Sequence, residues 1–223
     1  MFEFLSVFVQ YADQWGPRLA EAAVVSARIS LLGFALAAVV GLVLALMQDT
    51  SSALLRGVAK GYVIFFRGVP VLAILFLIYF GLPGIGVVFD AEPAAIVGLG
   101  LAFAAQMAEV YRAGLSAIPK GQWEAARSVG FLPGQVLFLI ILPQVARIVA
   151  APVIVTFVAL LKDSSLASLI TVNELVLEGR ALATEYFLPL HIYIWVGVMY
   201  FIIAFPLSML AKLLSRRARL GTR

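Results

Sequence analysis

Long apolar stretches alternate with short polar segments along this chain, and this pattern predicts its secondary structure. Three stretches contain no charged residue: Ile29–Met47, Gly68–Phe89 and Tyr186–Ala211. Each is close to or above the roughly 20 apolar residues that an α-helix needs to cross a bilayer. Two shorter stretches, Pro93–Ala108 and Ile148–Leu161, reach that length only if the helix extends beyond them. We therefore predict an all-α, polytopic membrane protein with about five transmembrane helices.

The composition agrees with this prediction. Of the 223 residues, 63% are hydrophobic and 13% are charged, whereas a soluble domain has about 25% charged residues. A single soluble core cannot bury so much apolar surface, so we expect the lipid bilayer to be its solvent. The chain has no cysteine and one histidine, which excludes a disulfide framework and argues against a metal site.

The distribution of basic residues predicts the orientation, because Lys and Arg accumulate on the cytoplasmic side of membrane proteins. With the N-terminus outside, most of the 16 basic residues lie inside: Arg56, Lys60, Arg67, Arg112, Lys120, Arg127, Arg147, Lys212, Arg216, Arg217, Arg219 and Arg223. The remainder lie outside: Arg18, Arg28, Lys162 and Arg180. We therefore expect an N-out, C-in topology. The net charge of +4 then reflects a basic inner rim and implies no nucleic-acid partner.

We expect three segments along the chain. Residues 1–18 lack the basic start of a signal peptide and are predicted to form an amphipathic helix on the outer face. Residues 19–214 form the transmembrane domain, and residues 215–223 form a basic cytoplasmic tail. Small residues recur every four positions in the first and third spans, at Gly33, Ala37, Gly41 and Ala45 and at Ala94, Gly98 and Ala102. Such ladders let helix backbones approach closely, and we interpret them as packing inside the bundle rather than as a subunit interface.

A polar segment interrupts the apolar pattern between the third and fourth spans. Pro119 ends the third helix, and Gln122–Val129 consists mainly of helix formers. Gly130 is placed to end this short helix, and Pro133 redirects the chain. A short helix with an exposed Trp123 and small alanines suits a groove on a partner protein. The alternative interpretation is a connecting loop that lies on the lipid headgroups.

The spacing within this segment resembles a known motif. Glu124, Ala125 and Ala126, then Gly130, then Ile140-Ile141-Leu142-Pro143 fit the pattern EAA-x3-G-x9-I-x-LP. That pattern is typical of the permease subunits of binding-protein-dependent ABC importers. The stretches RGVPVL, AEVYRAG, PKGQWEAA and LKDSSLASLI are similar to the branch of this family that imports polar amino acids. The resemblance extends from Leu32 to Glu174.

This resemblance implies a multi-pass permease in a bacterial cytoplasmic (inner) membrane that works by alternating access. Its implied partners are two copies of an ATP-binding ABC subunit, a second permease subunit, identical or paralogous, and an extracytoplasmic solute-binding protein. Glu124, Ala125, Ala126 and Gly130 are implied to couple the permease to the ATPase, through a cytoplasmic coupling helix between spans three and four. The implied substrate is a polar amino acid or a related compound such as cystine or an opine.

The chain has no ATPase motif of its own. A P-loop requires Gly-Lys followed by Ser or Thr, and none of Lys60, Lys120, Lys162 and Lys212 stands in that context. We therefore expect ATP and Mg²⁺ to bind the partner ATPase. The chain itself is expected to be a transport subunit without a cofactor, not an enzyme.

Polar residues within the spans are candidates for the substrate pathway, because ionisable groups in a bilayer are costly. Asp163 offers an acceptor for the ammonium group of an amino acid, and Ser164 and Ser165 offer donors for its carboxylate. The alternative is a helix end at the outer surface, where the serines bond the backbone and Lys162 reaches water. Gln106 is a further pathway candidate.

Glu109 and Arg112 lie three residues apart on one helix face, and we interpret them as a structural pair. Two other functions stay open. An ATP-independent secondary transporter or channel usually has more helices and inverted repeats, and the sequence shows no repeat. A membrane anchor for a soluble complex needs no ionisable residues within its spans.

Overall fold

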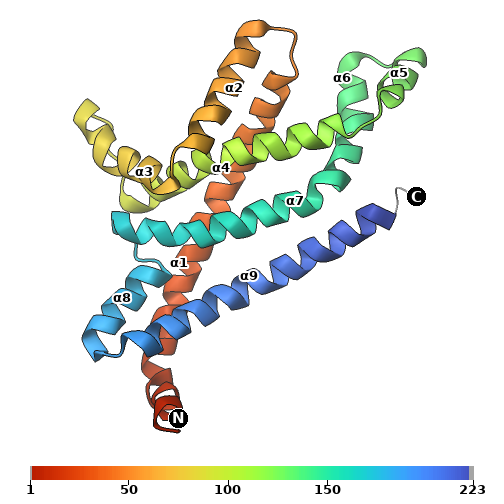
Figure 1. Ribbon diagram of the computed structural model, residues 1–223. Coiled ribbons are helices and arrows are strands. Elements are labelled where there is room, and N and C mark those ends of the chain that lie inside the picture. Colours follow the sequence, from red (N-terminus) through yellow and green to blue (C-terminus); the bar gives the residue numbers. More distant parts are fainter. Residues whose placement is uncertain (1, 221–223) are drawn as a thin grey trace.

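A computed structural model describes residues 2–220, and every regular element in this range is helical (Figure 1). The α-helices are α1 (Phe2–Gln48), α2 (Ala53–Gly68), α3 (Val71–Phe76), α4 (Ala91–Ser116), α5 (Lys120–Ser128), α6 (Pro133–Gln135), α7 (Leu142–Asp163), α8 (Leu175–Tyr186) and α9 (Pro189–Leu220). Shorter helical turns are η1 (Leu77–Gly81), η2 (Leu82–Ile85), η3 (Val136–Ile141) and η4 (Ser164–Ile170). The prediction of an all-α protein is confirmed.

The number of membrane spans agrees with the prediction of about five. Within the described residues, four helical stretches are long and apolar enough to cross a bilayer: Phe4–Gln48, Ala91–Ser116, Pro133–Ile170 and Pro189–Arg216. A fifth candidate combines α2 with α3, η1 and η2, which bend by 105° at a short break.

The second span differs from its prediction. The uncharged stretch Gly68–Phe89 predicts a helix that starts near residue 68, whereas the chain is already helical from Ala53 and breaks at Val69 and Pro70. Val69 is extended (φ −101°, ψ 133°), because a proline disfavours the helical conformation in the residue before it. The uncharged stretch therefore marks only the second arm of a bent pair.

The fourth span extends beyond its apolar core at both ends, as its length requires. Helix α7 follows the π-helical turn η3 directly, and the 3-10 turn η4 continues it to Ile170. Pro143 lies in the first turn of α7, where it supplies no N–H to the helical ladder. A π-turn just before such a proline is a local adjustment by which membrane helices accommodate the lost hydrogen bond.

The last span starts later than predicted, because the chain turns within the uncharged stretch. Tyr186 ends α8, Phe187 adopts a left-handed backbone (φ 56°), and α9 begins at Pro189. Helix α8 itself was not predicted, since its charged residues gave it the pattern of an external connection. Helix α9 continues to Leu220, so the expected basic tail, residues 215–223, begins inside a helix. Residues 221–223 lie outside the described range.

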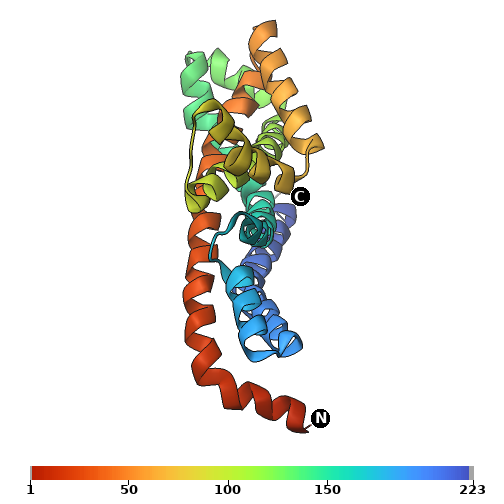
Figure 2. The ribbon, with the colours of Figure 1, turned by 90° about the vertical axis from the view of Figure 1, so that its left-hand side faces the viewer.

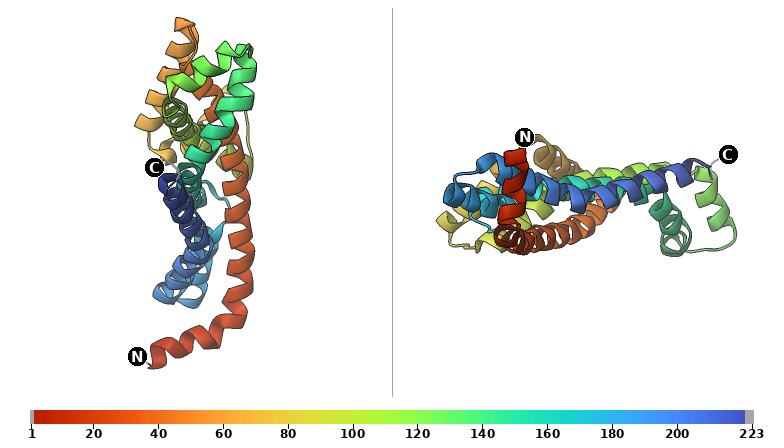
Figure 3. Two further views of the ribbon diagram at one scale, coloured as in Figure 1. Left: turned by 90° about the vertical axis from the view of Figure 1, so that its right-hand side faces the viewer. Right: turned by 90° about the horizontal axis from the view of Figure 1, so that it is seen from below.

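The expected outer-face segment, residues 1–18, forms the first turns of α1 from Phe2 onward, and Met1 lies outside the described range. Pro17 is inside the helix, and Figures 2 and 3 show the first turns at a marked angle to the rest of α1. Trp15 is fully buried and contacts the ring of Tyr186 at 5.7 Å between centroids. The segment therefore packs against α8 as well as forming an end of the molecule.

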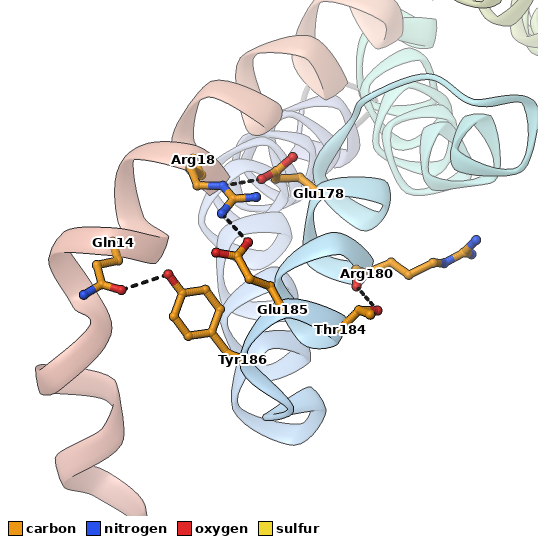
Figure 4. Close-up of polar contacts among 7 residues, drawn as sticks. All are labelled: Gln14, Arg18, Glu178, Arg180, Thr184, Glu185 and Tyr186. Atoms are coloured by element: carbon orange, nitrogen blue, oxygen red, sulfur yellow. Dashed lines mark hydrogen bonds and ion pairs between the residues drawn. The ribbon is translucent and has the colours of Figure 1, made fainter.

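Ion pairs reinforce this junction between α1 and α8 (Figure 4). Arg18 donates from Nε to Glu178 and from a terminal nitrogen to Glu185, both at 2.7 Å. Tyr186 donates its hydroxyl to the Gln14 side chain at 2.8 Å. Figure 4 shows Arg180 pointing away from these contacts.

Helices α1 and α4 run parallel and in close contact. A Cβ atom on Gly33 would meet the Leu99 Cβ at 3.4 Å, and one on Gly41 would meet the Met107 Cβ at 2.5 Å. In the other ladder, a Cβ on Gly98 would approach a methyl group of Leu75 on α3. Both ladders therefore pack inside the bundle, as predicted. Two parallel spans require one return crossing between them, which the bent pair of α2 and α3 supplies.

Candidate functional site

Helix α5 forms where the sequence predicts a short polar helix, and it runs from Lys120 to Ser128. Figure 1 shows α5 and α6 together at one end of the molecule, far from the N-terminus and from α8. The spans α4 and α7 lead to and from this end. The α5–α6 segment is therefore anchored at both ends by membrane helices and is not a free loop.

Gly130 fixes how the chain leaves α5. Its φ is +88°, a left-handed conformation that is accessible to glycine without strain but costly for most other residues. Its N–H donates to the Arg127 carbonyl at 3.0 Å, and the Phe131 N–H donates to the Ala126 carbonyl at 3.3 Å. These two bonds form a Schellman motif, which satisfies carbonyls that a helix end leaves open. The glycine predicted to end this helix has that position for a stereochemical reason.

The two sides of α5 have different surroundings. Ala126 is only 5% exposed, and Trp123 is half-buried against the same apolar cluster. Trp123 was expected on the exposed surface, and the structure corrects this. Glu124 and Ala125 are exposed, so they belong to the free face, whereas Ala126 anchors the helix.

The second half of the motif supports the first. Val136 and Ile141, in the π-turn η3, are fully buried in the cluster that also contains Ala126. Leu115 and Ile118, from the end of α4 and the turn after it, complete the contact. The spacing between Gly130 and the Ile-x-Leu-Pro sequence thus brings η3 underneath α5.

A cavity of about 540 Å³ lies between α7 and α9. One face of α7 and one face of α9 line it: Val155, Val158, Ala159, Lys162 and Asp163, and Ser208, Ala211, Lys212 and Ser215. Asp163 was expected from the sequence, whereas the wall formed by α9 was not. The available signal was the spacing of Ser208, Lys212 and Ser215, which places three polar residues on one face of an apolar helix.

Lys162 and Asp163 lie beside the second half of α9. They share the cavity with Ser208, which is 19 residues after Pro189, or about 28 Å along α9 at the usual helical rise. They therefore lie far from the start of α9.

The other pathway candidates do not line this cavity. Ser164 is fully buried and donates to the Leu161 carbonyl at 2.7 Å, and Ser165 donates to the Lys162 carbonyl at 2.7 Å. Gln106 is exposed on α4. The serine hydroxyls bond the backbone, as in the alternative interpretation, and they stabilise the transition from α7 to η4.

Glu109 and Arg112 form a bidentate contact on α4. The Arg112 Nε lies 3.2 Å from one Glu109 oxygen, and a terminal nitrogen lies 2.7 Å from the other. Arg67, at the end of α2, approaches the same carboxylate at 4.0 Å. The carboxylate therefore lies between two cations from different helices.

Glu174 is a polar centre that the sequence analysis missed. It is fully buried; one oxygen accepts the N–H groups of Val176 and Leu177, and the other accepts the hydroxyls of Ser26 and Tyr200. Burial raises the pKa of the Glu174 carboxyl, and these hydrogen bonds oppose that shift. The carboxylate joins the start of α8 to α1 and α9. Its only sequence signal is an acidic residue directly before a helix.

No group of three or more His, Cys, Asp or Glu side chains within residues 4–216 is placed to hold a metal ion. The candidate functional sites are therefore two polar regions on a helical membrane scaffold. One is a short helix with a free face at one end, and the other is a charged cavity between two spans.

Comparisons with known proteins agree with this architecture. Residues 37–220 match the family described as binding-protein-dependent transport system inner membrane component. The probable amino-acid ABC transporter permease protein YckA of Bacillus subtilis (strain 168) is 40% identical over 189 residues, which cover 85% of this chain and 84% of YckA. The L-cystine transport system permease protein TcyB of the same organism is 36% identical over 190 residues, covering 85% of this chain and 81% of TcyB.

A solved structure has the same fold along nearly its whole length. It is described as the crystal structure of an amino acid ABC transporter with histidines, shares 30% sequence identity and has a TM-score of 0.85. The match covers 96% of this chain and 98% of that one. The chain therefore belongs to the family of inner membrane components of binding-protein-dependent transport systems.

Proposed function

We propose that this chain is the membrane-spanning permease subunit of an ATP-driven importer of a polar amino acid or a related compound such as cystine or an opine. Its family assigns the general role: a multi-pass transport component of a bacterial inner membrane whose ATPase activity lies in a partner subunit. The same family works with a separate binding protein. The names of YckA and TcyB, which specify amino-acid and L-cystine transport, support the substrate class.

The proposal places α5 in the cytoplasm as the coupling helix, in an N-out, C-in chain. The single observation that carries this proposal is that one face of α5 is buried against the bundle and the other is exposed. Trp123 and Ala126 pack against the bundle, while Glu124 and Ala125 stay free for the ATPase. A helix that is fixed on one side and free on the other transmits the movement of a partner to the spans, which shifts an inward/outward equilibrium. Gly130, at the end of α5, fixes the direction in which the chain leaves this helix.

The complete importer in this proposal contains two permease subunits, identical or paralogous, and two ATP-binding subunits. ATP and Mg²⁺ bind the ATP-binding subunits, and this chain holds no cofactor. Within the permease, the pathway passes the cavity between α7 and α9, where Asp163 accepts the ammonium group of the substrate. Ser164 and Ser165 hold the turn that follows Asp163, and Gln106 is a secondary candidate on α4.

The test is reconstitution of the permease with its ATP-binding subunits and binding protein in proteoliposomes. We expect an amino acid to stimulate ATP hydrolysis and to accumulate inside. Ala125→Arg, on the free face of α5, is expected to lower uptake at least about tenfold, because a bulky cation prevents close docking. Ala53→Arg is the matched control, since Ala53 is also an exposed alanine, at the start of α2.

Each part of the proposal has its own contradicting result. Uptake by Ala125→Arg at the level of Ala53→Arg overturns the docking face. Amino-acid uptake that proceeds without ATP and without the ATP-binding subunits favours a secondary transporter or channel. Hydrolysis that never couples to uptake of any amino acid, cystine or opine overturns the importer.

A further inference from the structure

The ionisable residues of the α7–α9 cavity have no ion-pair partner among the side chains that the structure describes. The ion pairs among the described side chains, residues 4–216, all join an arginine to a glutamate, and they involve Arg18, Arg28, Arg67 and Arg112. Lys162, Asp163 and Lys212 take part in none of them. Their charges are available to something that this chain does not itself supply.

All three residues lie within helices that are long and apolar enough to span the membrane. Lys162 and Asp163 belong to the stretch Pro133–Ile170, and Lys212 belongs to Pro189–Arg216. Ionisable side chains in such helices face a protein interior or a water-filled cavity, because exposure to lipid is costly. The shared cavity provides that surrounding, and Ser208 and Ser215 keep the α9 wall polar on both sides of Lys212.

The charges in the cavity are two ammonium groups and one carboxylate. Lys162 and Lys212 come from opposite walls, and Asp163 lies beside Lys162. A neutral amino acid offers one carboxylate and one ammonium group, which leaves one lysine unpaired. A basic amino acid brings a second cation to a site that already has a positive excess, and repulsion between like charges opposes its binding. An acidic amino acid offers two carboxylates and one ammonium group, which matches the site charge for charge.

The size of the cavity permits this ligand. Its volume of about 540 Å³ lies within the roughly 300–1,000 Å³ that is usual for small-molecule sites. Val155, Val158 and Ala159 form an apolar side, against which the methylene groups of an amino-acid side chain can pack.

We propose that the cavity between α7 and α9 is a binding site for an acidic amino acid, in which Lys162 and Lys212 bind the two carboxylates and Asp163 binds the ammonium group. This inference rests on the proposed importer function and narrows its substrate to the dicarboxylic amino acids. It also assigns α9 a direct part in selecting the substrate, through Lys212.

The test measures binding to the intact complex of permease and ATP-binding subunits without the binding protein, so that the selectivity belongs to the membrane subunits. The probes are radiolabelled L-glutamate, L-glutamine and L-arginine. We expect L-glutamate to bind most tightly. Lys212→Met is expected to weaken L-glutamate binding at least about tenfold, because one carboxylate loses its charged hydrogen-bond donor, and to leave L-glutamine binding within about threefold. Lys212→Arg retains the preference for L-glutamate.

Lys60→Met is the matched control, because Lys60 is an exposed lysine on α2 and lies outside the cavity. It is expected to bind all three amino acids as the wild type does. Size-exclusion profiles and melting temperatures of both methionine variants establish that each complex stays folded.

The inference is overturned if L-glutamine or L-arginine binds more tightly than L-glutamate, or if Lys212→Met and Lys60→Met bind alike. A further measurement compares the binding of phosphatidylglycerol vesicles by the wild-type and Lys212→Met complexes. The inference is also overturned if Lys212→Met changes only this lipid binding and leaves amino-acid binding as it was, since the cavity then takes a lipid headgroup. The proposed importer survives these results if any amino acid, cystine or an opine is imported at the expense of ATP. It fails separately if no such import occurs.

Discussion

Gly41 and Met107 lie so close that a Cβ atom on Gly41 would be 2.5 Å from the Met107 Cβ. The obstacle is not a flexible side-chain tip, because the Ala104 carbonyl oxygen would lie at 3.0 Å and the Ala108 nitrogen at 3.1 Å. The separation of α1 and α4 is thus set by the absence of a side chain at residue 41. Small residues serve this purpose in membrane helices, where close van der Waals contact replaces the hydrophobic effect.

Gly41→Ala is therefore expected to destabilise the protein. Forcing a methyl group into a packed contact costs about 1–3 kcal/mol, even though alanine is a better helix former than glycine. In a chain of this size each kcal/mol lowers the melting temperature by about 2–4 °C. Thermal unfolding in detergent measures the difference. Gly57→Ala is the control, because a Cβ on Gly57 meets nothing within 4 Å; a melting temperature for Gly41→Ala equal to that of Gly57→Ala contradicts the packing argument.

Gly130 gives a second prediction, because its left-handed backbone is required for the exit from α5. Gly130→Ala is expected to cost about 1–2 kcal/mol locally, because a Cβ atom disfavours the left-handed backbone, and to reduce the coupling of ATP hydrolysis to uptake. Gly130→Pro is expected to abolish coupling, since proline holds φ near −65° and has no N–H for the Arg127 carbonyl. The measurement is the ratio of substrate uptake to substrate-stimulated ATP hydrolysis, both determined in the same proteoliposomes.

Two control variants separate the effect of the left-handed backbone at Gly130 from the effect of replacing a glycine in this segment. Gly130→Asn is expected to retain most coupling, because asparagine tolerates the left-handed region. Gly134→Ala lies in the same segment without a positive φ and is expected to behave as the wild type. Full transport by Gly130→Pro contradicts a coupling role for this turn.

The structure also shows which features could be predicted from sequence. Uncharged length predicted most of the spans, and the local pattern of polar residues, glycine and proline predicted the short helix α5, because both depend on residues that are near in sequence. The inward direction of Ala126 could not be predicted. Trp123 and Ala126 share one face of α5, and only Val136 and Ile141, which pack beneath that face, decide that it is buried.

The cavity wall and the Glu174 centre were missed for a related reason. Asp163 meets Lys212 and Ser208 only because α9 returns beside α7. Glu174 is buried only because Ser26 and Tyr200 converge on it from helices distant in sequence. Such polar contacts depend on the tertiary arrangement, and no local pattern signals them.

Glu109 supplies a third prediction, which distinguishes a structural pair from a substrate ligand. Glu109→Gln removes the charge that Arg112 and Arg67 share. Both arginines are about half exposed, so the expected loss of stability is small, about 0–1 kcal/mol. Amino-acid selectivity in the binding assay is expected to stay that of the wild type. A change in the order of preference for L-glutamate, L-glutamine and L-arginine contradicts the structural interpretation.

Glu174 gives a fourth prediction, because one buried carboxylate satisfies four donors. Glu174→Ala leaves the hydroxyls of Ser26 and Tyr200 and two backbone N–H groups without this acceptor, and each unsatisfied buried group costs about 1–3 kcal/mol. We expect a loss of several kcal/mol in total and a lower melting temperature in detergent. Tyr200→Phe removes one donor only and is expected to cost about 1 kcal/mol.

Glu185→Ala is the control for this comparison, since that carboxylate is half exposed and pairs with Arg18 at the surface; about 0–1 kcal/mol is expected. The pH dependence of stability provides an independent measurement. Burial raises the folded-state pKa of Glu174 above its ordinary value of 4.5, so the folded chain binds this proton more tightly than the unfolded chain does. Stability therefore falls as the pH rises from about 4.5 to the folded-state pKa. Glu174→Gln does not titrate and is expected to lose this slope, whereas an unchanged slope in Glu174→Gln would assign it to another group.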